Sequence, residues 1–187
     1  MVKEHKPVVA MFGGSFDPPH LGHQQIVQEV VKNFDIDGLL VVPTYLNPFK
    51  TSSLASAKQR LDWCHTLFDT EEKVLVDDYE IEKGQSTYTS DSVKHFNIVY
   101  HVKYLIIGAD NLASLTQWHH FEWLNANIIW VVATRDSYLL NVDELRQWEV
   151  LPLNTPISSS QIRTLKDLHY IDNKIKKSVQ QVLEGQH

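Results

Sequence analysis

Two histidines three residues apart, His20 and His23, stand in a loop rich in glycine and proline that could bind phosphate. The segment reads G-G-S-F-D-P-P-H-L-G-H over residues 13–23. Residues three apart lie on one face of a helix, so two imidazolium groups would point the same way from its first turn. Free N–H donors at a helix N-terminus also favour anions. The pattern predicts a site for phosphate oxygens.

Other interpretations of this loop are a metal site, a purely structural role, or a different nucleotide motif. No third metal ligand is evident from the sequence, so we expect no metal held by these histidines. The chain lacks the G-x-x-x-x-G-K-[ST] pattern of P-loop proteins and the G-x-G-x-x-G pattern of dehydrogenases. The loop therefore predicts phosphate binding of another kind.

A second candidate segment, I-S-S-S-Q-I-R over residues 157–163, lies near the other end of the chain. Serines before an apolar-periodic stretch are a helix N-terminus signal, and capping alone would explain them. Arg163, however, lies one turn inside the expected helix. A guanidinium beside free N–H groups again fits polyphosphate.

Three further segments carry polar or aromatic side chains at the ends of expected strands. They are residues 43–50 (P-T-Y-L-N-P-F-K), residues 85–92 (Q-S-T-Y-T-S-D-S), and residues 107–110 (I-G-A-D) with Trp118 eight residues on. Each also has an ordinary interpretation: a proline-rich loop, a turn before a helix cap, and a core tryptophan. From the residues alone both interpretations stay open.

Alternating strands and helices must position these loops. We expect strands at Pro7–Phe12, Gly38–Pro43, Lys73–Val76, Tyr104–Gly108 and Asn127–Ala133, and helices at Leu21–Phe34, Ala55–Phe68, Ser90–Asn97, from Gly108 to Leu124, Ser159–Leu168 and Asp172–Leu183. Near-continuous apolar strands between helices indicate an α/β fold with a doubly wound, Rossmann-like parallel sheet. Ligands of such sheets bind beyond the carboxyl ends of the strands, where the candidate loops fall.

Length and composition are those of an ordinary globular protein. The 187 residues suit a single domain over 1–187, and 43% are hydrophobic and 21% charged. A net charge of -6 argues against a nucleic-acid partner. The only cysteine, Cys64, can form no internal disulfide, which suits a reducing cytoplasm. The apolar run Val8–Phe12 is too short for a signal peptide or a membrane span, so we expect a cytoplasmic protein without a membrane partner.

Residues 13–23, which we call the first loop, closely resemble the N-terminal motif of the nucleotidylyltransferase superfamily, G-G-[ST]-F-D-P-x-H-x-G-H, at every position. Residues 157–163, which we call the last loop, resemble that superfamily's I-S-[ST]-[ST]-x-[IV]-R motif, which binds the β- and γ-phosphates. The resemblance implies that both histidines contact the phosphates of ATP and that adenosine lies against the glycines of the first loop. The nucleotide-binding residues it implies are Gly13, Gly14, Ser15, Phe16, Gly22, Gly108, Asp110, Ile157, Ser158, Ser159 and Ser160.

The three intermediate segments resemble the bacterial nicotinate-mononucleotide adenylyltransferases, whose patterns are P-x-x-x-x-P-x-K, S-Y-T-x-x-T, and G-x-D followed by a tryptophan. The resemblance implies that the tryptophan stacks on the pyridine ring, that Tyr88, Thr89 and backbone N–H groups surround the nicotinate carboxylate, and that Asp110 faces a ribose hydroxyl. The acceptor-binding residues it implies are Asn47, Tyr88, Thr89, Trp118 and Arg135.

This chain departs from that family's pattern at four places. Ser92 replaces the second threonine, Thr87 stands where serine is usual, and Phe49 replaces a small or basic residue before Lys50. Residues 134–137, T-R-D-S, keep the arginine but lack the usual proline-glycine. These departures concern fine contacts with the substrate rather than the reaction.

The resemblance implies transfer of the adenylyl group of ATP to nicotinate mononucleotide, in line and without a covalent intermediate. The cationic donors would be His20, His23, Lys50 and Arg163, and Mg²⁺ would arrive with ATP. Alternatives are pantetheine-phosphate adenylyltransferase, an enzyme that also accepts nicotinamide mononucleotide, a non-catalytic nucleotide sensor, and a class I aminoacyl-tRNA synthetase fragment. The sequence leaves the oligomeric state open, a homo-oligomer included.

Overall fold

One sheet of six strands forms the centre of the computed structural model, which describes residues 5–135 and 140–185. The strands are β1 Val8–Gly14, β2 Gly38–Pro43, β3 Val74–Val76, β4 His101–Gly108, β5 Ile129–Arg135 and β6 Trp148–Leu153. The helices are α1 Leu21–Asn33, α2 Ala57–Phe68, α3 Tyr79–Glu82, α4 Thr89–Phe96, the 3₁₀ helix η1 Ala109–Gln117, α5 Phe121–Asn127, α6 Ser159–Leu165 and α7 Asn173–Glu184.

The strand order is β3-β2-β1-β4-β5-β6, and every neighbouring pair is parallel. The order reverses between β1 and β4, which is the point where ligands bind in sheets of this kind. The prediction of a Rossmann-like, doubly wound parallel sheet is confirmed.

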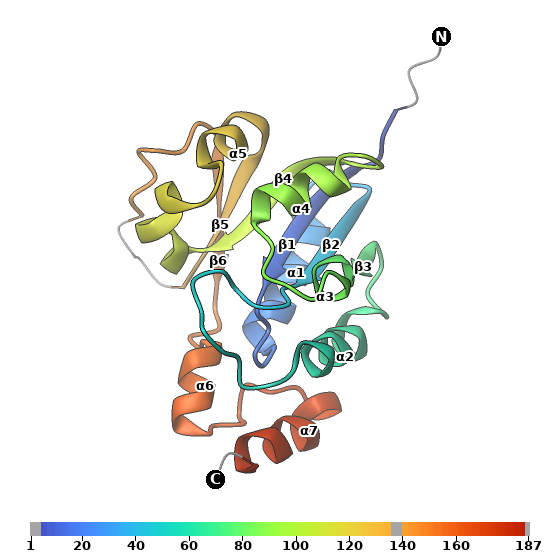
Figure 1. The fold of residues 1–187 in the computed structure, drawn as a ribbon, viewed down its shortest axis with the longest axis vertical. Coiled ribbons are helices and arrows are strands. Elements are labelled where there is room, and N and C mark those ends of the chain that lie inside the picture. The colour runs from blue at the N-terminus through green and yellow to red at the C-terminus, as the bar shows by residue number, and fades with distance from the viewer. Residues whose placement is uncertain (1–4, 136–139, 186–187) are drawn as a thin grey trace.

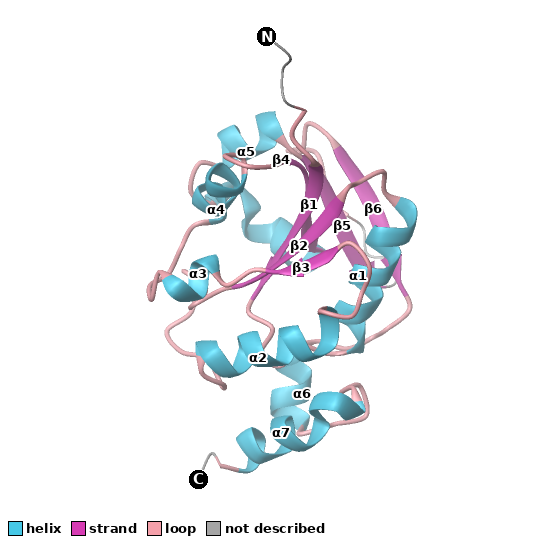
Figure 2. Cartoon of the chain, turned by 90° about the vertical axis from the view of Figure 1, so that its right-hand side faces the viewer, coloured by secondary structure: helices cyan, strands magenta, loops and turns pink. Residues whose placement is uncertain are grey.

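Alternate residues of each strand point to opposite faces, and each face has its own core. Phe12 and Val41 pack on the face covered by α1, α2, α6 and α7. Their neighbours Met11 and Val42 pack on the other face, with apolar residues of α4, η1 and α5. Burial on both faces explains why the central strands are apolar almost throughout. Figure 2 shows α4 and α5 on one side of the sheet and α1 on the other.

The last two helices lie beyond the carboxyl ends of the strands, at the end of the molecule opposite to the N-terminus (Figure 1). Ile175, Val179 and Leu183 of α7 recur every four residues and are buried in the same core as α2. Trp63 Nε1 of α2 also donates to Ser178 Oγ of α7, at 3.0 Å. α6 precedes α7 in the chain and lies at the same end of the molecule.

Three elements differ from the sequence-based expectation. Strand β6 and the four-residue helix α3 were not predicted. The single helical stretch expected between Gly108 and Leu124 is instead η1 followed by α5, separated at His120, whose φ is +57°. In the described part of the chain no helix has the length and apolar character needed to span a bilayer.

Candidate active site

His20 and His23 form the N-terminal cap of α1. His20 is the N-cap residue, and its Nδ1 accepts a hydrogen bond from Gly22 N at 3.1 Å. His23 Nδ1 in turn accepts from His20 N at 3.1 Å. The two rings lie with their centroids 3.9 Å apart. The spacing of three residues is therefore that of a capping box, with histidines in place of the usual serine and glutamate.

This cap corrects the expectation that the two rings are imidazolium ions. A ring nitrogen that accepts a hydrogen bond from a backbone N–H carries no proton of its own, and Nδ1 accepts in both His20 and His23. The hydrogen bonds therefore favour neutral rings protonated at Nε2. Such rings are oriented N–H donors rather than cations. Histidine is also not among the favoured N-cap residues, so helix capping alone does not account for its presence.

Gly22 gives the His20 ring the space it needs. A Cβ atom at Gly22 would lie 3.0 Å from both Cε1 and Nδ1 of His20. Real Cβ atoms rarely come so close, so a side chain at this position would require the His20 ring to move by a few tenths of an ångström. The glycine expected to face adenosine thus has a second role inside the cap.

The rest of the first loop combines partly buried glycines with a buried ring. Gly13 and Gly14 end β1 beside Val42 and Pro43 of β2, at the carboxyl edge of the sheet. Phe16 has a φ of +47° and is 2% exposed. Its ring packs against His23, with the centroids 5.0 Å apart. The buried Phe16 ring therefore supports the His23 ring.

The last loop folds as a capped helix start. Ser158 is the N-cap of α6, and its Oγ accepts from Gln161 N at 3.2 Å, while Gln161 Oε1 accepts from Ser158 N at 2.9 Å. Capping thus accounts for Ser158, as one interpretation of the sequence proposed. Ile157 is buried in the core, so its side chain anchors the loop.

Hydrogen bonds join the last loop directly to the first. Arg163 Nη1 donates to the carbonyl oxygen of Asp17 at 2.6 Å, and Nη2 donates to Ser160 Oγ at 3.0 Å. Ser159 Oγ donates to the carbonyl oxygen of Pro18 at 2.9 Å. Two segments more than 140 residues apart in sequence therefore form one surface, as the two motifs predicted.

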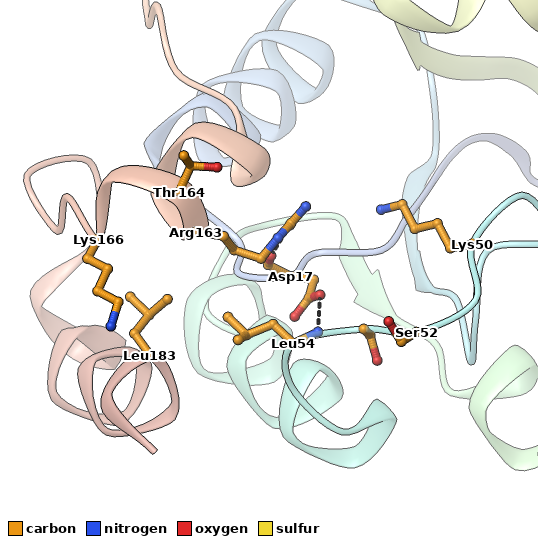
Figure 3. Close-up of a pocket in the computed structure, with 9 residues that line it drawn as sticks. Asp17, Lys50, Ser52, Leu54, Arg163, Thr164, Lys166 and Leu183 are labelled. Carbon is orange, nitrogen blue, oxygen red and sulfur yellow. Dashed lines mark hydrogen bonds between the residues drawn. The ribbon is translucent and has the colours of Figure 1, made fainter. Parts of the chain in front are cut away.

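Lys50 reaches the same surface from the loop after β2. Its Nζ donates to Ser15 Oγ at 3.2 Å. Burial lowers the pKa of Lys50, and the Arg163 guanidinium lowers it further, whereas the Asp17 carboxylate raises it. A pocket of about 440 Å³ lies between these groups, and Lys166 also lines it. In Figure 3 the Lys50 amine and the Arg163 guanidinium point toward the same space. Two cations facing one pocket suit an anion with several charges.

The residues expected to bind the acceptor form a second group. Tyr88 precedes α4, and its ring stacks on that of His119, with the centroids 4.3 Å apart and the planes 20° apart. Ser90 Oγ lies 3.4 Å from His119 Nδ1. The neighbouring Trp118 is half-buried and packs edge-on against Trp130, with the centroids 6.3 Å apart. Tyr88 thus contacts the residue that follows Trp118 in the chain. His119 was not among the residues expected from the sequence.

Of the remaining expected residues, those that the structure describes have local contacts or are exposed. Asn47 Oδ1 accepts from Phe49 N at 2.9 Å, so its side chain stabilises the turn before Lys50. Thr89 begins α4 and is partly exposed. Asp110 follows Gly108 at the end of β4 and is exposed. Arg135 ends β5, but its side chain lies outside the described residues, as do positions 136 and 137.

Sequence reasoning missed two residues that hold these loops together, Asp17 and Arg60. Both are buried, at 3% and 1% exposure. Asp17 lay within the recognised motif but had no role assigned to it. Arg60 lay in an expected helix, where a charged residue is ordinarily assumed to be exposed to solvent.

No group of three His, Cys, Asp or Glu side chains that could hold a metal occurs within residues 5–135 and 140–185. Both carboxylate oxygens of Asp17 accept backbone hydrogen bonds, from Leu54 N and Ala55 N. The donor set of the site is therefore one of N–H, hydroxyl and ammonium groups, which suits phosphate oxygens.

Comparison with known proteins gives consistent results. Residues 11–165 match the model of the family described as cytidylyltransferase-like. A protein of Sulfurovum sp. (strain NBC37-1) named "Probable nicotinate-nucleotide adenylyltransferase" is 58% identical over 184 residues, 98% of either chain. One of the same name from Sulfurimonas denitrificans is 37% identical over 179 residues, 96% of either chain. The structure of the Plasmodium falciparum nicotinic acid mononucleotide adenylyltransferase complexed with NaAD has a TM-score of 0.74 at 19% identity, covering 96% of this chain and 95% of that one, which shows a shared fold.

Proposed function

The chain belongs to the nicotinate-nucleotide adenylyltransferases, within the cytidylyltransferase-like family, and from this premise we propose that it joins the adenylyl group of ATP to nicotinate mononucleotide. The products are nicotinate adenine dinucleotide, a precursor of NAD, and pyrophosphate. The observation that carries the proposal is the junction of the two phosphate motifs, in which Arg163 and Ser159 bond to the carbonyls of Asp17 and Pro18.

The reaction needs no covalent intermediate. The phosphate of nicotinate mononucleotide is already an anion, and one of its oxygens attacks the α-phosphorus of ATP. The bond from the α-phosphorus to the bridging oxygen breaks, and pyrophosphate leaves with those electrons. Catalysis then consists of holding the reactants in line and stabilising the charge on the phosphate oxygens.

The side chains supply different kinds of donor to this charge. His20 and His23 would donate from Nε2, in an orientation set by the backbone hydrogen bonds to Nδ1. Arg163 and Lys50, which face the same pocket, would bind the phosphates that leave as pyrophosphate. Oriented donors in a partly desolvated site cost no reorganisation when the charge moves, which makes them effective.

We propose that Mg²⁺ enters as part of the ATP substrate. The residues fit this role, because a magnesium ion bound to a triphosphate keeps several waters and needs few protein ligands. When bound, the ion would neutralise charge on the phosphate oxygens. The protein's part is to bind the outer phosphate oxygens through Arg163, Lys50 and the first turn of α6.

The acceptor site we propose is the group formed by Trp118, Tyr88 and Thr89. The Trp118 ring would hold the pyridine ring by stacking but cannot distinguish a carboxylate from a carboxamide. Donors around the substituent must do that. A site of donors alone satisfies both oxygens of nicotinate and opposes the NH₂ of nicotinamide, at a cost of about 1–3 kcal/mol. We expect kcat/KM to favour nicotinate mononucleotide by about tenfold or more.

The decisive experiment compares both acceptors with the unmodified protein and with histidine variants. His23→Ala is expected to lose at least about 10²-fold in turnover. His20→Asn is the sharper variant, because asparagine is a favoured N-cap residue and should keep α1 intact, with Tm unchanged or raised, while the Nε2 donor is lost and turnover falls by about 10²-fold. Near-normal turnover in a folded His20→Asn variant would contradict the assigned role, and equal use of both acceptors would indicate a dual-specificity enzyme.

A further inference from the structure

Arg60 of α2 is a buried cation bound to backbone carbonyls. Nη1 donates to the carbonyl oxygens of Ser15 and Thr44, both at 2.7 Å, Nη2 donates to that of Tyr45 at 2.6 Å, and Nε donates to that of Ala55 at 3.3 Å. A charge at 1% exposure is costly unless it is fully hydrogen-bonded. The guanidinium group, a rigid fork with five donors, can satisfy several carbonyls at once. A single side chain thus joins the first loop to both ends of the loop after β2.

Asp17 makes the complementary set of bonds. Its Oδ2 accepts from Leu54 N at 2.7 Å and its Oδ1 from Ala55 N at 2.9 Å. Figure 3 shows the Leu54 contact next to Lys50 and Arg163. At the other end, Thr44 N donates to the carbonyl oxygen of Gly14 at 2.9 Å. Residues 44–55, which we call the Lys50 loop, are therefore attached to the first loop at both ends.

Between these attachments the Lys50 loop has mainly local contacts. Lys50 N donates to the carbonyl oxygen of Asn47 at 2.8 Å, and the Phe49 side chain is 62% exposed. The contact from the middle of the loop back to the first loop is the bond of Lys50 Nζ to Ser15 Oγ. The backbone of the Lys50 loop is therefore held at its two ends, and the Lys50 amine bonds to Ser15 between them.

We propose that Arg60 is a positioning residue for the adenylyl transfer, holding Lys50 against the phosphate-binding first loop without contacting either substrate. The inference rests on the proposed function for the role of Lys50, and on the four hydrogen bonds for the role of Arg60. An apolar residue at position 60 would leave four carbonyls without this donor. A lysine could reach fewer of them, and without the planar geometry.

The first test measures the loop itself. In Arg60→Gln, hydrogen exchange of the amides in residues 46–53 should accelerate by about tenfold or more, while amides of α4 and α7 keep their rates. The matched control is Val102→Ala, a cavity variant at the amino end of β4, far along the strand from the site, which should leave the loop unchanged. Unchanged exchange in a folded Arg60→Gln variant overturns the inference.

The second test asks whether Arg60 acts through Lys50. Arg60→Gln should lower kcat/KM by about 10²-fold, since small displacements of a positioned group have effects of that size. In a protein that already carries Lys50→Met, the same change should have little further effect, whereas an independent structural role would add its full loss. If the losses in kcat/KM caused by Arg60→Gln and by Lys50→Met are fully additive, the inference is overturned. Val102→Ala should retain the parent kcat/KM.

Two further outcomes are distinguishable. If Arg60→Gln does not fold, Asp17→Asn loosens the attachment at residues 54 and 55 and should produce the same exchange pattern in residues 46–53. Unchanged exchange in that variant counts against the inference. If the unmodified protein forms no dinucleotide, the proposed function fails, and hydrogen exchange still decides whether Arg60 fixes the loop.

Discussion

Glu80 of α3 should make the protein's stability depend on pH in a direction opposite to that of a typical carboxylate. The side chain is 2% exposed, and its Oε1 accepts from Ser92 Oγ at 2.6 Å. Its Oε2 is buried and has no hydrogen-bond partner in the described structure. Burial raises the pKa of Glu80 from an ordinary 4.5 to about 7, although the Ser92 hydrogen bond and the Lys83 charge oppose the rise.

The sign and size of the effect follow from proton binding. Between pH 4.5 and about 7 the folded protein holds the Glu80 proton and the unfolded chain releases it. The contribution of Glu80 to the free energy of unfolding is thus fully present below pH 4.5 and falls as the pH rises through this window. A pKa rise of this extent corresponds to about 3 kcal/mol. Glu80→Gln cannot ionise, so it removes the free-energy cost of burying a charged carboxylate above pH 7.

The assay is urea unfolding of the parent and of Glu80→Gln from pH 4 to pH 9. The two proteins should be nearly equal at pH 4, and the variant should become more stable by about 3 kcal/mol above pH 8. Other titrating groups cancel in the difference. Glu82→Gln, an exposed change in the same helix, should shift stability by no more than about 0.5 kcal/mol at any pH. A difference that is flat with pH, or a less stable Glu80→Gln at pH 8, would refute the reasoning.

Three other predictions concern the site. Gly22→Ala should lower turnover by displacing the His20 ring, and the gain of about 1 kcal/mol that alanine normally brings to a helix should not appear; full activity would contradict the cap geometry. Dialysis against a chelator should abolish turnover and leave Tm unchanged, with activity restored by Mg²⁺; a stoichiometric zinc required for turnover would revive the histidine-ligand interpretation. Trp118→Ala should weaken the binding of nicotinate mononucleotide and of nicotinamide mononucleotide to the same extent. A large change in the ratio of their kcat/KM values would show that the Trp118 ring itself distinguishes the two acceptors.

The sequence predicted the central strands because burial on both faces leaves a strong apolar signal. Gly38–Pro43, for example, was predicted with the bounds that β2 has. Strand β6 was missed because Glu149 and Pro152 interrupt its pattern, and an edge strand tolerates both. The fold class was thus readable from the inner strands alone.

The parts of the candidate site that lie in sequence motifs could be predicted. The roles that depend on how deeply a side chain is buried could not. The two phosphate motifs indicated that residues 20–23 and 159–163 share a site, and the Arg163 bond to Asp17 joins these segments. Nothing in the sequence separates Arg60, buried beneath two loops, from a solvated arginine of an amphipathic helix. The protonation of His20 and His23 likewise depends on backbone N–H directions, which only the folded cap defines.

The edges of the sheet bear on how the protein behaves at high concentration. An unpaired strand edge can recruit a strand from another molecule and so begin aggregation. Here one edge, β3, is only three residues long. The other, β6, contains Glu149 and Pro152, and charged residues and proline are both typical of edge strands that avoid pairing. The same two residues that made β6 hard to recognise in the sequence are thus ones that disfavour pairing of this edge with a strand of another molecule.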